Sequence, residues 1–174
     1  MNKDEKLEAL NLALTNEKKE KEFYLMHAGR TKNKIGKDMF LSIAADEDVH
    51  YSKLLELYGK LEERGKWPED FEATMSSSKL GVIIDRVINE AANSGEVDAE
   101  DERAVEIAID FEREAEDFYK KLAGKAENES ERDFFDMLAS FEREHRLSLE
   151  DTLDYFRDPQ EWLERKGGRH LDGA

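Results

Sequence analysis

The sequence predicts an all-α protein, a four-helix bundle of two antiparallel helix hairpins joined by a long helical crossover. Three observations predict this fold class. Charged residues make up 40% of the 174 positions and proline occurs only twice, which favours long solvated helices over strands. Apolar residues recur at helical spacing over long segments. The chain also matches itself at an offset of 95 residues, so each half holds one helix pair.

The internal repeat places residues 10–58 over residues 105–153 without a gap. Where the two copies differ, apolar residues mostly replace one another, as Leu14 and Ile109 do. The identical pairs include Ala13 and Ala108, Glu17 and Glu112, Phe23 and Phe118, Tyr24 and Tyr119, Glu47 and Glu142, and His50 and His145. The chain is therefore a duplicated helix pair.

The first copy is expected to form two helices around a short polar turn. Leu7, Leu10 and Leu14 begin an apolar pattern that predicts a helix over residues 3–29, with Gly29 at its exit. The second helix is predicted over residues 35–64. A turn this short makes the two helices antiparallel neighbours.

The second copy repeats this organisation. One helix is predicted over residues 99–123, before Gly124, and the next runs to residue 157, before Pro159. Asn128 and Glu131 have the spacing of a capping box at the start of that last helix.

Residues 65–98 connect the two hairpins and include an amphipathic stretch from Lys79 to Asn93. A crossover of this length suits a bundle whose two hairpins pack side by side. We therefore expect residues 1–158 to form one helical domain. Residues 159–174 would be a C-terminal tail, either a short helix or a docking strap.

Composition excludes several functions. A net charge of −16 argues against nucleic acids and anionic membranes as partners, because their phosphates would be repelled. The chain has no cysteine, which excludes disulfides, thiolate nucleophiles, cysteine-bound zinc and iron–sulfur centres. The N-terminus is charged, and no segment approaches the ~18 apolar residues of a membrane span. We expect a soluble, cytoplasmic protein.

Two of the four histidines lie three residues after a glutamate, in Glu47–His50 and Glu142–His145. At this spacing both side chains leave the same face of a helix. One such pair is weak evidence in a glutamate-rich chain, but these two occupy equivalent places in the repeat. A mixed set of carboxylate and imidazole groups suits iron or manganese.

A further matched pair, Glu17 and Glu112, lies among core-type residues on the partner helices. A buried carboxylate without a partner would be strongly destabilising, and a metal ion would relieve that cost. The alternative is a set of surface glutamates with structural histidines, which the repeat disfavours. The six candidate metal ligands are Glu17, Glu47, His50, Glu112, Glu142 and His145.

Taken with Tyr24 and Tyr119, each seven residues after its glutamate, this pattern resembles the rubrerythrin branch of the ferritin-like superfamily over about residues 1–158. The resemblance implies a ferritin-like bundle holding two iron ions, with manganese or zinc as substitutes, that reduces hydrogen peroxide. It implies that Glu17 and Glu112 each bind one ion, that Glu47 and Glu142 bridge, and that His50 and His145 supply imidazoles.

By the same resemblance, Tyr24 and Tyr119 would hydrogen-bond to ligand carboxylates across the site. The alternative for both tyrosines is a plain place in the core.

The sequence departs from the family in two respects. Rubrerythrins carry a rubredoxin-like domain with four cysteines, so electrons here would come from a separate donor protein such as a rubredoxin. They also carry a seventh carboxylate three residues after the glutamate that corresponds to Glu112, and Ala115 stands there. Glu20, three residues after Glu17, is a candidate extra ligand, and the alternative is a surface charge beside Lys21.

The leading functional hypothesis is a di-iron peroxidase, with a homodimer implied by the resemblance. One alternative is an iron-binding ferroxidase, although ferritin centres usually carry a single Glu-x-x-His. Others are a di-metal oxidase that reacts with dioxygen, and a bundle that has lost its metal.

Overall fold

The computed structural model describes residues 1–68, 71 and 95–171, with side chains described up to residue 166. Over these ranges all regular structure is helical. The helices are α1 (Lys3–Arg30), α2 (Lys34–Arg64), α4 (Ala99–Ala123), α5 (Glu129–Arg157) and α6 (Pro159–Leu171). The amphipathic stretch predicted from Lys79 to Asn93 lies outside the described residues.

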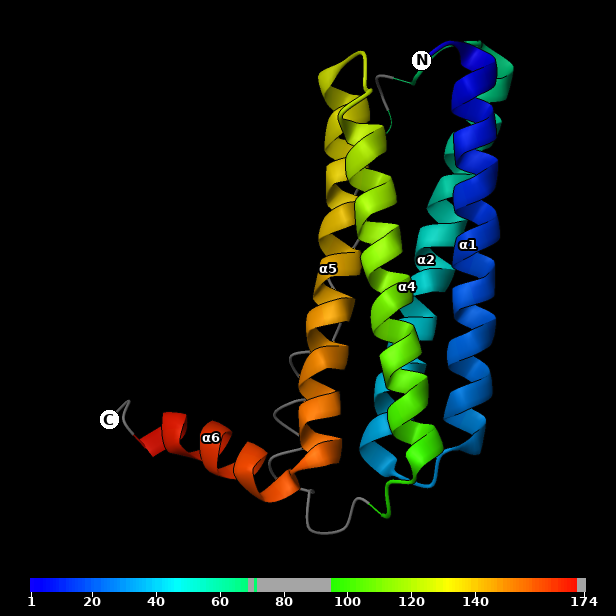
Figure 1. Ribbon diagram of the computed structural model, residues 1–174. Helices are drawn as coiled ribbons and strands as arrows, with labels where there is room; N and C mark the ends of the chain where they lie inside the picture. Colours follow the sequence, from blue (N-terminus) through cyan, green and yellow to red (C-terminus); the bar gives the residue numbers. More distant parts are fainter. Residues whose placement is uncertain (69–70, 72–94, 172–174) are drawn as a thin grey trace.

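Helices α1, α2, α4 and α5 run side by side as two antiparallel hairpins (Figure 1). This arrangement confirms the predicted ferritin-like helical bundle. Helix α6 leaves the end of α5 and points away from the bundle (Figure 1). Its Trp162 packs edge-on against Tyr155 of α5, with ring centroids 5.4 Å apart, and this contact joins the tail to the core.

Side-chain caps explain where the helices begin and end. Asn33 and Asn128 accept hydrogen bonds from backbone N–H groups at the starts of α2 and α5, and each such cap contributes about 1 kcal/mol. Helix α1 ends at Arg30, not at the predicted Gly29, because the extended backbone of Thr31 stops it.

The Glu131 part of the predicted capping box has a different role. The carboxylate of Glu131 accepts hydrogen bonds from Nζ of Lys6 at 2.9 Å and from the backbone N–H of Glu127 at 3.3 Å. It therefore ties the start of α5 to α1, and Asn128 alone provides the predicted cap.

Two apolar clusters fill the bundle, one towards each end. One contains Phe40, Val105 and Leu149, and the other contains Leu10 and Phe134. Each of the four bundle helices packs one segment in the first cluster and another segment in the second. The candidate ligands lie between these two segments. The site is thus a polar layer at mid-length, covered by apolar side chains on both sides.

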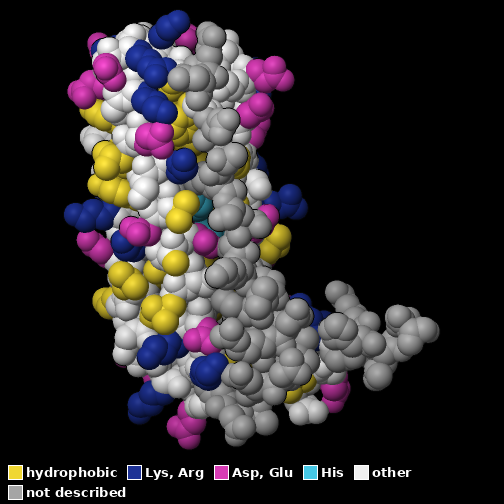
Figure 2. Space-filling view, turned by 180° about the vertical axis from the view of Figure 1, so that it is seen from behind, with side chains coloured by type: hydrophobic (Ala, Val, Ile, Leu, Met, Phe, Trp, Pro, Cys, Tyr) yellow, Lys and Arg dark blue, Asp and Glu magenta, His cyan; other side chains and the backbone are white. Residues whose placement is uncertain are grey.

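The two hairpins differ at the surface. On the face seen in Figure 2, apolar side chains are exposed among charged ones. Leu41 and Val49 of α2 are exposed, whereas the repeat places Asp136 and Glu144 at the equivalent positions of α5. The exposed large apolar side chains of the described residues are Leu12, Leu25, Met26, Leu41, Val49, Leu55 and Leu147. All but Leu147 belong to the first hairpin.

Gly95 fixes the end of the crossover against the turn between α1 and α2. Its φ is +87°, and a Cβ atom there would lie 2.7 Å from the carbonyl oxygen of Lys32. The side-chain amide of Asn33 donates a hydrogen bond to the carbonyl of Gly95 at 3.1 Å. Both its conformation and its close approach therefore require glycine.

Gly95→Ala should destabilise the protein more than Gly65→Ala. Gly65 also has a positive φ, +70°, but a Cβ there would meet no atom within 4 Å, so its replacement isolates the conformational cost of about 1–2 kcal/mol. Gly95→Ala adds the clash with Lys32. Urea midpoints of both variants measure the difference, and equal losses would contradict the close approach.

Candidate metal centre

All six candidate ligands lie together at the middle of the bundle. Each of the four helices contributes, α1 and α4 one glutamate each, and α2 and α5 one Glu-x-x-His pair each. No member has more than 2% of its surface exposed. The site is therefore closed to bulk water.

The six residues form two overlapping groups of four. One group is Glu17, Glu47, His50 and Glu142, and the other is Glu47, Glu112, Glu142 and His145. Within each group the potential ligand atoms all lie within 4.8 Å of one another. The carboxylates of Glu47 and Glu142 belong to both groups, which is the arrangement that two adjacent metal ions with shared ligands would need.

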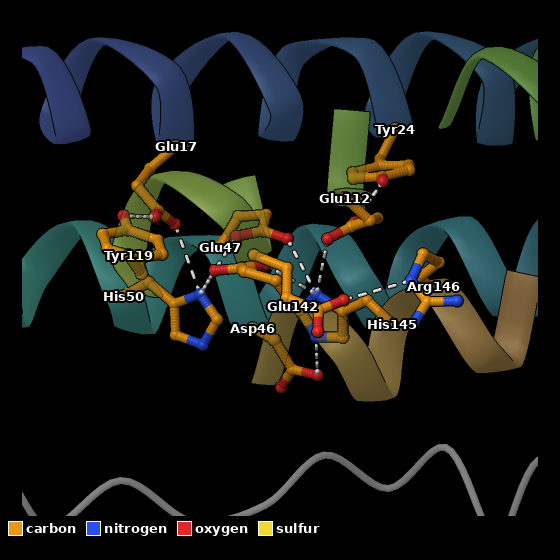
Figure 3. Close-up of polar contacts among 11 residues, drawn as sticks. Glu17, Tyr24, Asp46, Glu47, His50, Glu112, Tyr119, Glu142, His145 and Arg146 are labelled. Atoms are coloured by element: carbon orange, nitrogen blue, oxygen red, sulfur yellow. Dashed lines mark hydrogen bonds and ion pairs between the residues drawn. The ribbon is translucent and has the colours of Figure 1, made fainter. Parts of the chain in front are cut away.

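The ring of His50 turns its Nδ1 atom towards three carboxylates (Figure 3). Nδ1 lies 3.3 Å from Oε2 of Glu17, 3.1 Å from Oε2 of Glu47 and 3.5 Å from Oε1 of Glu142. One metal position is thereby defined by one imidazole and three carboxylate oxygens.

His145 repeats this arrangement in the other half. Its Nδ1 lies 3.1 Å from Oε1 of Glu47, 3.5 Å from Oε2 of Glu112 and 3.4 Å from Oε2 of Glu142. Each shared glutamate thus directs one oxygen towards each histidine. This is how a carboxylate is oriented when it bridges two ions.

Two tyrosines tie the hairpins together at this level. The hydroxyl of Tyr24 on α1 donates to Oε1 of Glu112 on α4, and that of Tyr119 on α4 donates to Oε1 of Glu17 on α1 (Figure 3). Burial raises the pKa of both tyrosines well above the ordinary value. They therefore stay protonated and keep donating to the carboxylates.

The donor set fits a pair of divalent cations. Within the described residues, several of its buried atoms approach a histidine nitrogen or carboxylate oxygen without forming a hydrogen bond of good geometry, namely Oε2 of Glu17, Oε1 of Glu47, Oε2 of Glu112, both carboxylate oxygens of Glu142 and Nδ1 of His145. Leaving such atoms unpaired is costly, and more so for charged groups. The four carboxylates also carry the formal negative charge that two divalent ions would neutralise.

When no ion is bound, protons neutralise part of this negative charge. Burial, followed by repulsion from neighbouring carboxylates, raises the pKa of Glu47 and of Glu142 well above the ordinary value. Burial opposes a charge on His145, but the carboxylates of Glu112 and Glu47 outweigh it and raise its pKa. For Glu17, burial is outweighed by His50, which lowers the pKa.

One polar contact of the site was not predicted from the sequence. Oδ2 of Asp46 lies 3.3 Å from Nε2 of His145, on the side of the ring that faces away from the carboxylates (Figure 3). The signal was present, because Asp46 directly precedes Glu47. In a chain with 43 acidic residues, however, one more aspartate beside a ligand attracts no notice.

Glu20 is buried beside the site, with 8% of its surface exposed, and its Oε2 has no hydrogen-bond partner among the residues that the structure describes. Lys21 pairs with Asp48 instead, so Glu20 is not a surface charge. It belongs to neither group of four. A cavity of about 390 Å³ between α1 and α4 is lined by Asn16, Lys19, Glu20, Phe111, Glu114, Ala115 and Phe118.

The rubrerythrin family model matches residues 8–153, a range that includes all six candidate ligands. No curated protein and no solved structure matches the chain. Among the described helices, none is long and apolar enough to cross a membrane. The family predicted from the sequence is confirmed, while the cytoplasmic location stays a prediction.

Without metal, the protein should become less stable as the pH rises from about 5.5 to about 8. The folded state holds protons on Glu47, Glu142 and His145 over a range in which the unfolded chain has released them. The free energy of unfolding therefore falls with increasing pH. Urea midpoints of the metal-free protein at the two pH values measure this trend.

The double variant Glu47→Gln, Glu142→Gln lacks the two carboxyl protons and keeps only that of His145, so its free energy of unfolding should fall less between the two pH values. Metal binding displaces protons, so the free energy of unfolding of the metal-loaded protein should increase with pH. A metal-free protein with the same midpoint at both pH values would contradict the raised pKa values.

Proposed function

The chain belongs to the rubrerythrin family, and from this premise we propose that it is a di-iron oxidoreductase that reduces hydrogen peroxide to water. The observation that carries the proposal is the buried layer in which Glu47 and Glu142 are shared by two groups of potential ligands. Iron is the proposed metal because the donors are carboxylates and imidazoles. Manganese and zinc are the alternatives.

In this proposal, Glu17 and His50 hold one ion and Glu112 and His145 hold the other. Glu47 and Glu142 would serve both ions, as their position in both groups suggests. When bound and reduced, the pair supplies the two electrons that, with two protons, convert one hydrogen peroxide into two waters. A separate electron-donor protein such as a rubredoxin returns the two electrons to the ions, since this chain has no cysteine with which to bind a rubredoxin-like iron centre.

The remaining residues of the site hold its geometry. Tyr24 and Tyr119 each fix one oxygen of a terminal glutamate and leave the other oxygen free for a metal ion. The apolar clusters on both sides limit the access of water. The ligands are held in place by packing and by the tyrosine hydrogen bonds, so they need little rearrangement during the reaction.

We further propose that the cavity between α1 and α4 admits the peroxide and that Glu20 serves as the extra carboxylate of the site. Glu20 and Ala115 both line this cavity, and both are nearly buried. Ala115 stands where the family has its seventh carboxylate, and its small side chain leaves room for the carboxylate of Glu20. Glu20 approaches from the opposite hairpin.

A homodimer is the proposed assembly, and the exposed apolar side chains of the first hairpin support it. The repeat places charged residues opposite all of them except Leu12, whose counterpart is Ile107, and this difference favours the first hairpin as the face that meets a partner. An iron-storing cage is the alternative assembly. Gel filtration separates the two, and a particle much larger than a dimer would favour iron storage.

The protein reloaded anaerobically with ferrous iron should bind about two ions per chain and be oxidised faster by hydrogen peroxide than by dioxygen. Glu142→Ala should reduce the bound iron to about one ion or less, because Glu142 serves both positions. Metal analysis and stopped-flow absorbance measure the two quantities.

Glu144→Ala is the matched control, since Glu144 is exposed on the same helix and should change neither quantity. Faster oxidation by dioxygen would point to an oxidase or a ferroxidase. Less than one ion per chain in the unaltered protein would contradict the di-iron proposal.

Glu20→Ala should keep the iron content and slow the reaction with peroxide. The reason is that Glu20 lies outside both groups of four but borders the cavity. The double variant Glu20→Ala, Ala115→Glu returns a carboxylate from the other hairpin and should restore part of the rate. Stopped-flow rates compare them, and an unchanged rate in Glu20→Ala would leave Glu20 without the proposed role.

A further inference from the structure

We propose that the two metal positions differ in affinity, and that the one formed by Glu112 and His145 binds its ion more tightly and fills first. The inference rests on the proposed di-metal function and adds an order of loading to it. Asp46 is the positioning residue responsible, because it contacts Nε2 of His145, whereas among the residues that the structure describes no carboxylate contacts Nε2 of His50.

The contact of Asp46 with His145 has the geometry that strengthens a metal ligand. Nδ1 of His145 faces the carboxylates, and Nε2 on the other side of the ring lies 3.3 Å from Oδ2 of Asp46. When Nδ1 binds a metal ion, Nε2 carries the hydrogen and donates it to Asp46. Such a bond fixes the tautomer and the ring orientation and makes the imidazole a stronger donor.

The repeat places Phe141 where Asp46 would stand in the other half. Phe141 is buried, and its ring lies against that of His50 with centroids 5.3 Å apart and planes at 36°. A phenyl ring offers no carboxylate oxygen to Nε2. Among the residues that the structure describes, none accepts a hydrogen bond from Nε2 of His50. Within the described part of the chain, the His50 ring is therefore held on that side by packing against Phe141.

The other ligands are balanced between the halves. Each terminal glutamate accepts a hydrogen bond from one tyrosine, and the two bridging glutamates direct one oxygen towards each histidine. Glu20 lies on the side of Glu17 but is in neither group of potential ligands. Within the six candidate ligands of the described residues, the carboxylate contact of His145 is thus the feature that sets one position apart from the other.

Anaerobic titration of the metal-free protein with Co²⁺ tests the inference, because each bound ion adds visible absorbance. We expect two separate steps. Asp46→Asn should weaken the first step about 10–100-fold, the usual effect of losing such a partner, and leave the second unchanged. Phe141→Asp supplies the missing carboxylate and should strengthen the second step until the two steps approach each other.

Two more variants assign the steps. Glu112→Ala should abolish the tight step, and Glu17→Ala the weak one. Asp46→Glu keeps a carboxylate and should recover part of the affinity, while Glu144→Gln on the exposed face should change nothing. Circular dichroism confirms that each variant is folded.

Two ions bound with equal affinity, an unchanged first step in Asp46→Asn, or loss of the tight step in Glu17→Ala would each overturn this inference and leave the di-metal function standing. Fewer than two Co²⁺ ions bound at saturation would overturn the di-metal function with it. The two failures are therefore distinguishable.

Discussion

Burying four carboxylates and two imidazoles inside an apolar bundle requires positive charge at the same place, and this constraint shapes the rest of the structure. The six side chains are almost completely buried between the two apolar clusters, so bulk water solvates their charges poorly. Metal ions meet the requirement when bound, and protons meet it otherwise, as the raised pKa values of Glu47 and Glu142 indicate. Metal content, protonation and stability are therefore linked in this protein.

Duplication of a helix pair provides the matched ligands, and later divergence makes the halves different. The pairing of Tyr24 with Glu112 and of Tyr119 with Glu17 keeps the original symmetry across the hairpins. Surface residues have diverged, and so has one matched pair of buried positions. Asp46 contacts His145, whereas its counterpart Phe141 packs against His50. The symmetric part fits two ions, and the asymmetric part is the basis for the proposed difference in their affinity.

The repeat made much of the site predictable, because Glu17 with Glu112 and the two Glu-x-x-His pairs occur at one offset. Helix bounds followed from apolar periodicity and caps, and they agree with the structure to within a residue or so. The family resemblance implied the contacts of Tyr24 and Tyr119 across the site, but other contacts between helices were not predicted. Asp46 reaches His145 from another helix, and its significance depends on packing that no local pattern encodes. The burial of Glu20 depends in the same way on how closely α1 approaches α4.

The most direct test of the di-metal centre is anomalous diffraction at the iron edge from crystals of the anaerobically loaded protein. The account predicts two peaks at mid-bundle, about 3.5–4 Å apart, with Glu47 and Glu142 between them and one of the two histidines beside each. A single peak, or peaks only at acidic groups on the surface, would contradict the account, and the buried carboxylates would then need another source of positive charge.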